Sequence, residues 1–146
     1  IYANQVDGGI IERNALYNSP NGRAIKVGSL SSSGVMPRGL IIRYNTMYNN
    51  LGPSNLQFSY AANNNQAYRN IFVKSSSQNV TQTSLSGTNN IVSANVGWLG
   101  KGVVQASGGL KDGGGNIQLD PQFVNATAAD FHTKNPAAAG YGLYAP

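Results

Sequence analysis

Short apolar runs rich in Ile, Val, Leu, Tyr and Phe alternate along the chain with clusters of Gly, Pro, Asn and Ser. This alternation is typical of short β-strands separated by turns. No stretch shows the period of about 3.6 residues that marks an amphipathic helix, and residues 61–68 are too polar to hold a helix against a core. The pattern predicts an all-β protein, with strands in residues 8–17, 23–28, 39–48, 55–60, 70–74, 79–85, 90–98, 101–106 and 116–119.

One of these runs is repeated. The sequence IIERN at residues 10–14 returns as IIRYN at residues 41–45, a step of thirty-one residues. The same step aligns three further pairs, namely Tyr17 with Tyr48, Ile25 with Leu56, and Val27 with Phe58.

Two weaker copies extend the repeat. A second step of thirty-one residues reaches residues 72–76, and residues 91–95 repeat the pattern after a shorter interval. Internal periods of this length are typical of solenoids, and short β-segments with polar corners favour a β-solenoid over an α-helical one. In this interpretation residues 29–39 are a loop insertion that lengthens the first coil. The alternative is an antiparallel sandwich, whose short strands and frequent turns produce a similar alternation.

The solenoid explains which positions the repeat retains. Equivalent residues of successive coils lie about 4.8 Å apart, so apolar ones build a continuous core and Asn side chains at an inward corner hydrogen-bond to one another. We expect this asparagine ladder to contain Asn14, Asn45 and Asn95, with Ser76 as a weaker member. The outward column is expected to contain Glu12, Arg43 and Lys74.

The C-terminal region carries a second pattern. A strand is followed by Asp120-Pro121, by an aromatic-Val pair at residues 123–124, by Asp130-Phe131, and by a Pro-containing end. This segment resembles the closing segment of secreted right-handed parallel β-helix proteins, although its final residues, NPAAAGYGLYAP, depart from the usual ending.

The resemblance implies a right-handed parallel β-helix of about four coils in residues 1–112, with a C-terminal capping segment in residues 113–146. It also implies a secreted or cell-surface location and a polysaccharide partner, because such proteins include polysaccharide lyases, glycoside hydrolases and adhesins. The open ends of a solenoid expose strand edges and need caps. At the N-terminal end we expect either upstream coils or self-association.

The charged residues of the chain limit which classes of binding partner are plausible. Charged residues make up only 10% of the chain, and the formal net charge is +5. The ten basic residues are dispersed, which disfavours nucleic acid, so the net charge reflects either the scarcity of acidic residues or a preference for acidic polymers in general. The chain has no Cys, its five carboxylates are not clustered, and no apolar run approaches the roughly 18 residues of a membrane span. We therefore predict no metal, no cofactor and no membrane partner.

The residues of the chain do not decide whether the protein is an enzyme. Glycoside hydrolysis usually needs two carboxylates that flank the bond, and no such pair is visible. A polysaccharide lyase acting on uronates needs cations near the substrate carboxylate, which Arg43 and Lys74 are placed to supply. The alternative is that both belong to a solvated ladder of charges.

Aromatic residues suggest direct contact with sugars. Tyr17, Tyr48 and Trp98 join Arg43 and Lys74 as candidate carbohydrate-binding residues, since aromatic faces with polar edges suit sugar rings. Tyr44, Tyr60 and Tyr68 add aromatic surface nearby in sequence. The alternative for all of these rings is ordinary packing. The competing functions are polysaccharide binding or processing, a structural or adhesive role of the fibre or tailspike type, and nucleic-acid binding, which the dispersed charges disfavour.

Overall fold

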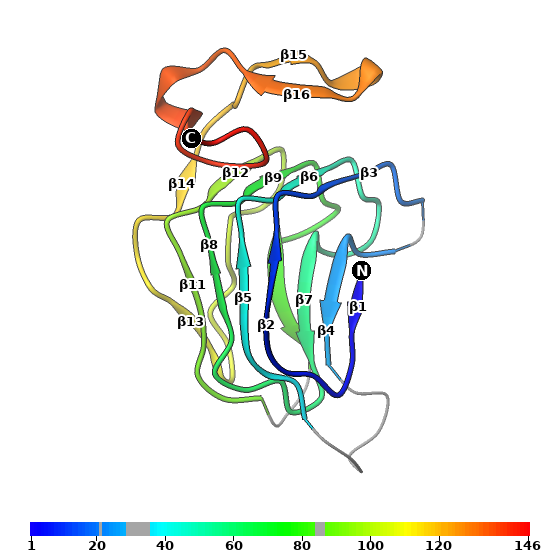
Figure 1. Ribbon diagram of the computed structural model, residues 1–146, viewed down its shortest axis with the longest axis vertical. Helices are drawn as coiled ribbons and strands as arrows, with labels where there is room; N and C mark the ends of the chain where they lie inside the picture. Colours follow the sequence, from blue (N-terminus) through cyan, green and yellow to red (C-terminus); the bar gives the residue numbers. More distant parts are fainter. Residues whose placement is uncertain (21, 29–35, 84–86) are drawn as a thin grey trace.

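The computed structural model describes residues 1–20, 22–28, 36–83 and 87–146, and it consists of three parallel sheets and a short antiparallel hairpin (Figure 1). Sheet 1 contains, in spatial order, β1 (Tyr2–Ala3), β4 (Ile25–Val27), β7 (Leu56–Ser59) and β10 (Val80–Thr83). Sheet 2 contains β13 (Leu110–Asp112), β11 (Asn90–Ser93), β8 (Gln66–Tyr68), β5 (Arg38–Arg43) and β2 (Asp7–Glu12). Sheet 3 contains β14 (Ile117–Gln118), β12 (Val96–Trp98), β9 (Ile71–Val73), β6 (Thr46–Tyr48) and β3 (Ala15–Tyr17).

The chain passes through these sheets in a fixed cyclic order. From β1 to β12, successive strands belong to sheet 1, sheet 2 and sheet 3 in turn, and each strand pairs in parallel with its equivalent from the next passage. We call one such passage a round. The antiparallel hairpin β15 (Phe123–Asn125) and β16 (Asp130–Thr133) follows, with short 3-10 helices at Ala126–Ala128 and Pro136–Ala138. The prediction of an all-β protein is confirmed, and its sheets are parallel.

The first step of the repeat is confirmed in register. Ile11 pairs with Ile42 on adjacent parallel strands, and Tyr17 pairs with Tyr48. The same step pairs Val27 with Phe58 in sheet 1. Matching side chains from the first two rounds therefore lie next to each other.

The prediction that the second step is also thirty-one residues is wrong. Ile42 pairs with Ala67, which in turn pairs with Val92, so each of these steps is twenty-five residues. Phe72 pairs with Met47 in sheet 3 and not with Ile41 in sheet 2. The sequence pattern favours Phe72-Val73 as the equivalents of Ile41-Ile42 because all four are large and apolar, whereas Gln66 and the small Ala67 occupy those positions.

The difference in length lies between sheets 1 and 2. In the second round β4 ends at Val27 and β5 begins at Arg38, whereas in the third round β7 ends at Ser59 and β8 begins at Gln66. The predicted insertion at 29–39 overlaps this longer connection, but its last two residues, Arg38 and Gly39, belong to β5, and its residues 29–35 lie outside the described residues. Residues 84–85 of the expected strand 79–85 also lie outside them.

The three sheets enclose the apolar core. Along each strand every second side chain points inward, and the inward positions of neighbouring rounds pack on one another. Full burial of each such side chain stabilises the fold by about 1.5–3 kcal/mol. The largest fully buried side chains of this core are Phe58, Phe72, Ile25, Ile42, Met47, Leu56, Val27, Val80 and Val92.

An asparagine ladder runs along the corner between sheets 2 and 3. At each link the Nδ2 of one Asn donates to the Oδ1 of the next, at 2.9–3.0 Å. The same Oδ1 also accepts from the backbone N–H of the preceding Asn. The ladder consists of Asn14, Asn45, Asn70, Asn95 and Asn116.

The predicted ladder is confirmed for Asn14, Asn45 and Asn95. Ser76 is not a member, because the step of twenty-five residues places Asn70 at that position. The Ser76 hydroxyl instead donates to the carbonyl of Gly52 at 3.1 Å.

Each ladder Asn follows a residue in the left-handed backbone region. The φ angles before the five ladder residues range from 49° to 70°, at Arg13, Tyr44, Arg69, Ala94 and Gly115. Glycine reaches this region without strain, and the chain uses it only at Gly115. The corner between sheets 2 and 3 therefore stores backbone strain at its other positions.

Replacing Ala94 by Gly should relieve this strain. At φ 49° a Cβ costs about 1 kcal/mol, so Ala94→Gly is expected to raise the free energy of unfolding by about that amount. Urea denaturation measures the change. Ala15→Gly is the matched control, because Ala15 lies in β3 with ordinary strand geometry and its replacement should lower stability. A loss of stability in both variants would contradict the expectation.

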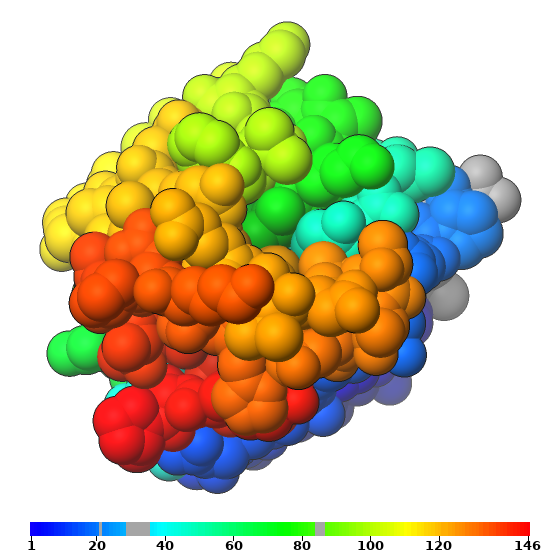
Figure 2. Space-filling view, turned by 90° about the horizontal axis from the view of Figure 1, so that it is seen from above, coloured from blue at the N-terminus to red at the C-terminus, as the bar shows by residue number. Residues whose placement is uncertain are grey.

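The C-terminal segment lies across the outer face of sheet 3 (Figures 1 and 2). We call residues 120–146 the tail. The buried Ala138 packs on Ile71, Val73 and Val96 from sheet 3, and half-buried side chains complete this second cluster, namely Tyr48, Trp98, Leu119, Phe123 and Tyr141. The division into residues 1–112 and 113–146 stays a prediction, but the ladder and sheet 3 both continue past it, to Asn116 and Gln118.

Candidate functional site

The three predicted aromatic residues share one row of sheet 3. Tyr17 pairs with Tyr48, Tyr48 pairs with Val73, and Val73 pairs with Trp98. This row faces the tail, and the Phe131 ring lies 5.4 Å from the Tyr17 ring and 5.6 Å from the Tyr48 ring, centroid to centroid. These rings therefore support the tail, and their role in binding carbohydrate stays a prediction.

The two predicted cations do not share a column. Arg43 lies on the outer face of sheet 2, and its partner in the next round is Tyr68. Lys74 is exposed in the turn after β9, with φ 60°. The predicted column of Glu12, Arg43 and Lys74 is therefore wrong, because the second step is shorter than the first. The observed column contains Glu12, Arg43, Tyr68 and Ser93.

Arg43 is held on both sides within this column. Its Nε donates to the Glu12 carboxylate at 2.7 Å, and its Nη1 donates to the Tyr68 hydroxyl at 3.4 Å. The hydrogen bonds with Tyr68 and then Glu12 raise the pKa of Arg43 above its usual value. The Arg43 Cζ lies 5.8 Å from the centroid of the Tyr44 ring. The guanidinium is charged and fixed in position.

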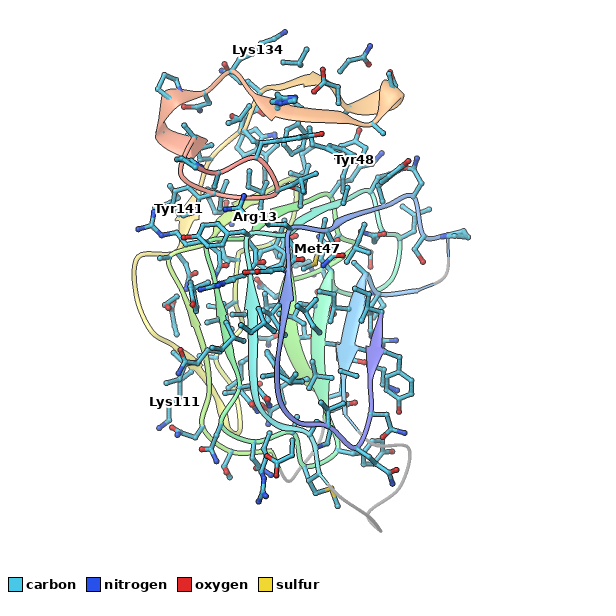
Figure 3. All side chains as sticks on the ribbon, in the orientation of Figure 1. Arg13, Met47, Tyr48, Lys111, Lys134 and Tyr141 are labelled. Carbon is cyan, nitrogen blue, oxygen red and sulfur yellow. The ribbon has the colours of Figure 1, made fainter. Side chains whose placement is uncertain are left out.

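Two more arginines extend this surface to the tail. The Arg13 Cζ lies 5.2 Å from the Tyr44 ring centroid, and its Nη1 donates to the carbonyls of Leu143 and Ala145. The Arg69 Cζ lies 5.4 Å from the Tyr141 ring centroid. Figure 3 shows Arg13 and Tyr141 where sheet 2 meets the tail. We call this surface the arginine–tyrosine patch, and it consists of Arg13, Arg43, Tyr44, Tyr68, Arg69 and Tyr141.

Sequence reasoning found this patch only in part. The sequence predicts Arg43 as a site residue and indicates aromatic surface at Tyr44 and Tyr68, but a step of thirty-one residues places Lys74 where Tyr68 lies. Arg13 and Arg69 were missed because the tail that they contact is far away in sequence. No local signal marks such contacts.

Each of the five Asp and Glu side chains accepts a hydrogen bond from the protein itself. Asp7 binds Arg38, which lowers the pKa of Asp7, and His132 binds Asp130 and lowers its pKa by the same kind of hydrogen bond. Glu12 binds Arg43. The remaining contacts are Asp112 with Gly114 and Asn116, and Asp120 with the backbone of Gln122. This arrangement supplies turns and ion pairs, and it gives no support to a pair of hydrolytic carboxylates.

The described residues contain no group of three His, Asp or Glu side chains that would hold a metal ion. Within that part of the chain, no helix has the length and apolar composition of a membrane span.

Comparison with known proteins assigns the chain to no family. No family model, curated protein or solved structure matches the chain. The all-strand architecture with parallel sheets is compatible with the resemblance in the C-terminal segment, and the specific family type stays a proposal.

Proposed function

We propose that the chain is a right-handed parallel β-helix that binds an acidic polysaccharide through the arginine–tyrosine patch. The cyclic order of the three sheets supports the β-helix, since rounds that pair in parallel with the next round are its basic geometry. The right hand is supported by the strong general preference of parallel crossover connections for that hand. The extracellular location belongs to the same proposal.

The observation that carries the binding proposal is the composition of the patch. Three arginines and three tyrosines from successive rounds and the tail lie on one surface. Guanidinium groups bind carboxylates with paired hydrogen bonds, and tyrosine rings offer apolar faces with a polar edge. A uronate polymer presents both a carboxylate and a sugar ring in each repeating unit, so it suits such a surface.

Binding without hydrolysis fits the charges of the chain. The net charge of +5 favours an anionic polymer, and the carboxylates are already engaged. Arg43 is the central residue, because its position is fixed by Glu12 and Tyr68 before any ligand arrives. Such preorganisation reduces the entropy lost on binding.

Replacing Arg43 by Gln should weaken binding of polygalacturonate. Loss of one charge-assisted hydrogen bond costs about 1.5–3 kcal/mol, which corresponds to roughly a 10- to 100-fold increase in Kd. Calorimetry or affinity electrophoresis measures this change, with neutral dextran as the reference polymer. Lys26→Gln is the control, because it removes the same charge from sheet 1, where Lys26 lies over Tyr2.

Equal losses of polygalacturonate affinity in the two variants would mean that only the net charge matters, and would contradict binding through the patch. Absence of polygalacturonate binding by the unaltered protein would contradict the function itself. Release of unsaturated sugar products would contradict binding without catalysis and favour a lyase.

A structural or adhesive role is the second candidate. It is supported by the regular stacking of rounds and by the unpaired edge of the first round, where β1, β2 and β3 each have a strand neighbour on one side only among the described strands. Retained stability and assembly without glycan binding would favour it.

A further inference from the structure

The asparagine ladder has a direction. The Oδ1 of Asn45 accepts from the backbone N–H and the Nδ2 of Asn14, at 3.2 and 2.9 Å, and the Nδ2 of Asn45 donates to Asn70 at 3.0 Å. The links from Asn70 to Asn95 and from Asn95 to Asn116 have the same orientation. In every link between two ladder residues the donor therefore belongs to the earlier Asn and the acceptor to the later one.

The C-terminal end of the ladder is closed by the chain itself. The Nδ2 of Asn116 donates to the Asp112 carboxylate at 2.7 Å and to the carbonyl of Val92 at 2.8 Å. Asp112 also accepts from the backbone N–H of Gly114. The position that a sixth Asn would fill is occupied by a carboxylate of the same round.

The N-terminal end of the ladder is open. Among the described residues no donor reaches the Oδ1 of Asn14, whereas the Oδ1 of Asn45 accepts two hydrogen bonds. The apolar side chains of this round are also less covered, since Ile11 and Leu16 are half-buried while their partners Ile42 and Met47 are fully buried.

We propose that the edge formed by β1, β2 and β3 is a docking surface for a further round of extended chain that carries an Asn in register with Asn14. That Asn would donate its backbone N–H and its Nδ2 to the Oδ1 of Asn14, as Asn14 does to Asn45. Its inward apolar residues would cover Ile11 and Leu16. This edge adjoins the arginine–tyrosine patch at Arg13, which lies between β2 and β3, but the inference does not depend on polysaccharide binding.

The ladder also argues against a second copy of the described chain as the occupant. The C-terminal end of another copy has no free ladder donor, because Asp112 occupies that of Asn116. The N-terminal end of another copy would place one acceptor, the Oδ1 of its Asn14, against the same acceptor. Two acceptors without a donor between them do not pair.

A fusion tests the proposal. A copy of residues 56–79 placed directly before Ile1 adds one round. In the native chain this segment is followed by Val80, and the register of sheet 1 makes Ile1 the equivalent of Val80, so the copy joins the chain in register. The copy supplies its own ladder residue, the duplicate of Asn70. A second fusion carries Asn70→Asp in the copy alone, which retains the size of the side chain and its acceptors but removes the side-chain donor at neutral pH.

The measurement is hydrogen exchange at the backbone amides of β2, together with the midpoint of urea denaturation. The fusion with Asn is expected to slow exchange in β2 by at least about tenfold and to raise the midpoint. The Asn70→Asp fusion is expected to lose most of both gains. Equal gains in the two fusions, or unchanged exchange in both, would overturn the proposal. A concentration-dependent dimer of the unfused protein that protects β2 would overturn it as well.

Discussion

Asn70→Asp is expected to lower the free energy of unfolding by at least about 4 kcal/mol at pH 7. Asn70 is fully buried, and its Nδ2 donates to the carbonyls of Ile42 and Tyr68 and to the Oδ1 of Asn95, at 2.9–3.0 Å. Aspartate replaces this donor by a second oxygen that faces three acceptors. Both N–H donors of this amide, which serve the three acceptors, are lost with hydrogen bonds of about 1 kcal/mol each, and a charge is buried without a cation.

The same variant should depend on pH with a defined sign. Burial and the surrounding acceptors raise the folded-state pKa of the new carboxyl above its unfolded value of about 3.9. The variant is therefore least destabilised below about pH 3.9, where the carboxyl is protonated in both states, and it loses stability as pH rises through the folded-state pKa. Urea denaturation across this range measures the dependence.

Gln66→Glu is the control for this prediction, because Gln66 is exposed on the adjacent strand β8 and undergoes the same change of amide to carboxylate. Its stability should change by no more than about 0.5 kcal/mol. If Asn70→Asp behaved like this control, and without pH dependence, the ladder would not be a buried hydrogen-bond network.

Phe72→Ala is expected to cost about 3–5 kcal/mol of stability, the usual loss for a fully buried aromatic side chain. Phe72 is fully buried in β9, where it lies between Met47 and Gly97 of the neighbouring rounds. The large ring next to a glycine fills the core, and a Cβ on Gly97 would meet Val103 Cγ2 at 2.7 Å. Neighbouring side chains therefore have little freedom to close the cavity that alanine would leave.

Urea denaturation measures this loss, with Ile41→Ala as the control. Ile41 is a half-buried outward residue of β5, so its replacement should cost much less than that of Phe72. A loss below about 1 kcal/mol for Phe72→Ala would place the ring outside the core and would contradict the register of sheet 3.

The strand content and the first step of the repeat were accessible from the sequence, because Ile11 and Ile42 are both large, apolar and followed by the same Asn. The next step was not accessible, since Ala67 and Asn70 occupy the equivalent positions without a large apolar pair. The apolar pair Phe72-Val73 lies thirty-one residues after Ile41-Ile42 and therefore mimics a second step of the same length. The longer connection of the second round produced this error.

The candidate site was less predictable for a related reason. Once the register is correct, Arg43 and Tyr68 become neighbours, so that part of the patch follows from sequence and a step of twenty-five residues. The contacts of Arg13 with the tail span the whole chain and involve backbone carbonyls, which any sequence offers. Contacts of this kind depend on the fold and leave no pattern in the residues.

Disulfide trapping tests the shorter register most directly, since the chain has no cysteines of its own. Neighbouring parallel strands hold paired Cα atoms about 4.8 Å apart, within the range of about 4.4–6.8 Å that a disulfide bridges. Arg43→Cys with Tyr68→Cys is expected to form an intramolecular disulfide on mild oxidation, whereas Arg43→Cys with Lys74→Cys is not. Peptide mapping identifies the bond, and preferential cross-linking of the second pair would contradict the stacked arrangement.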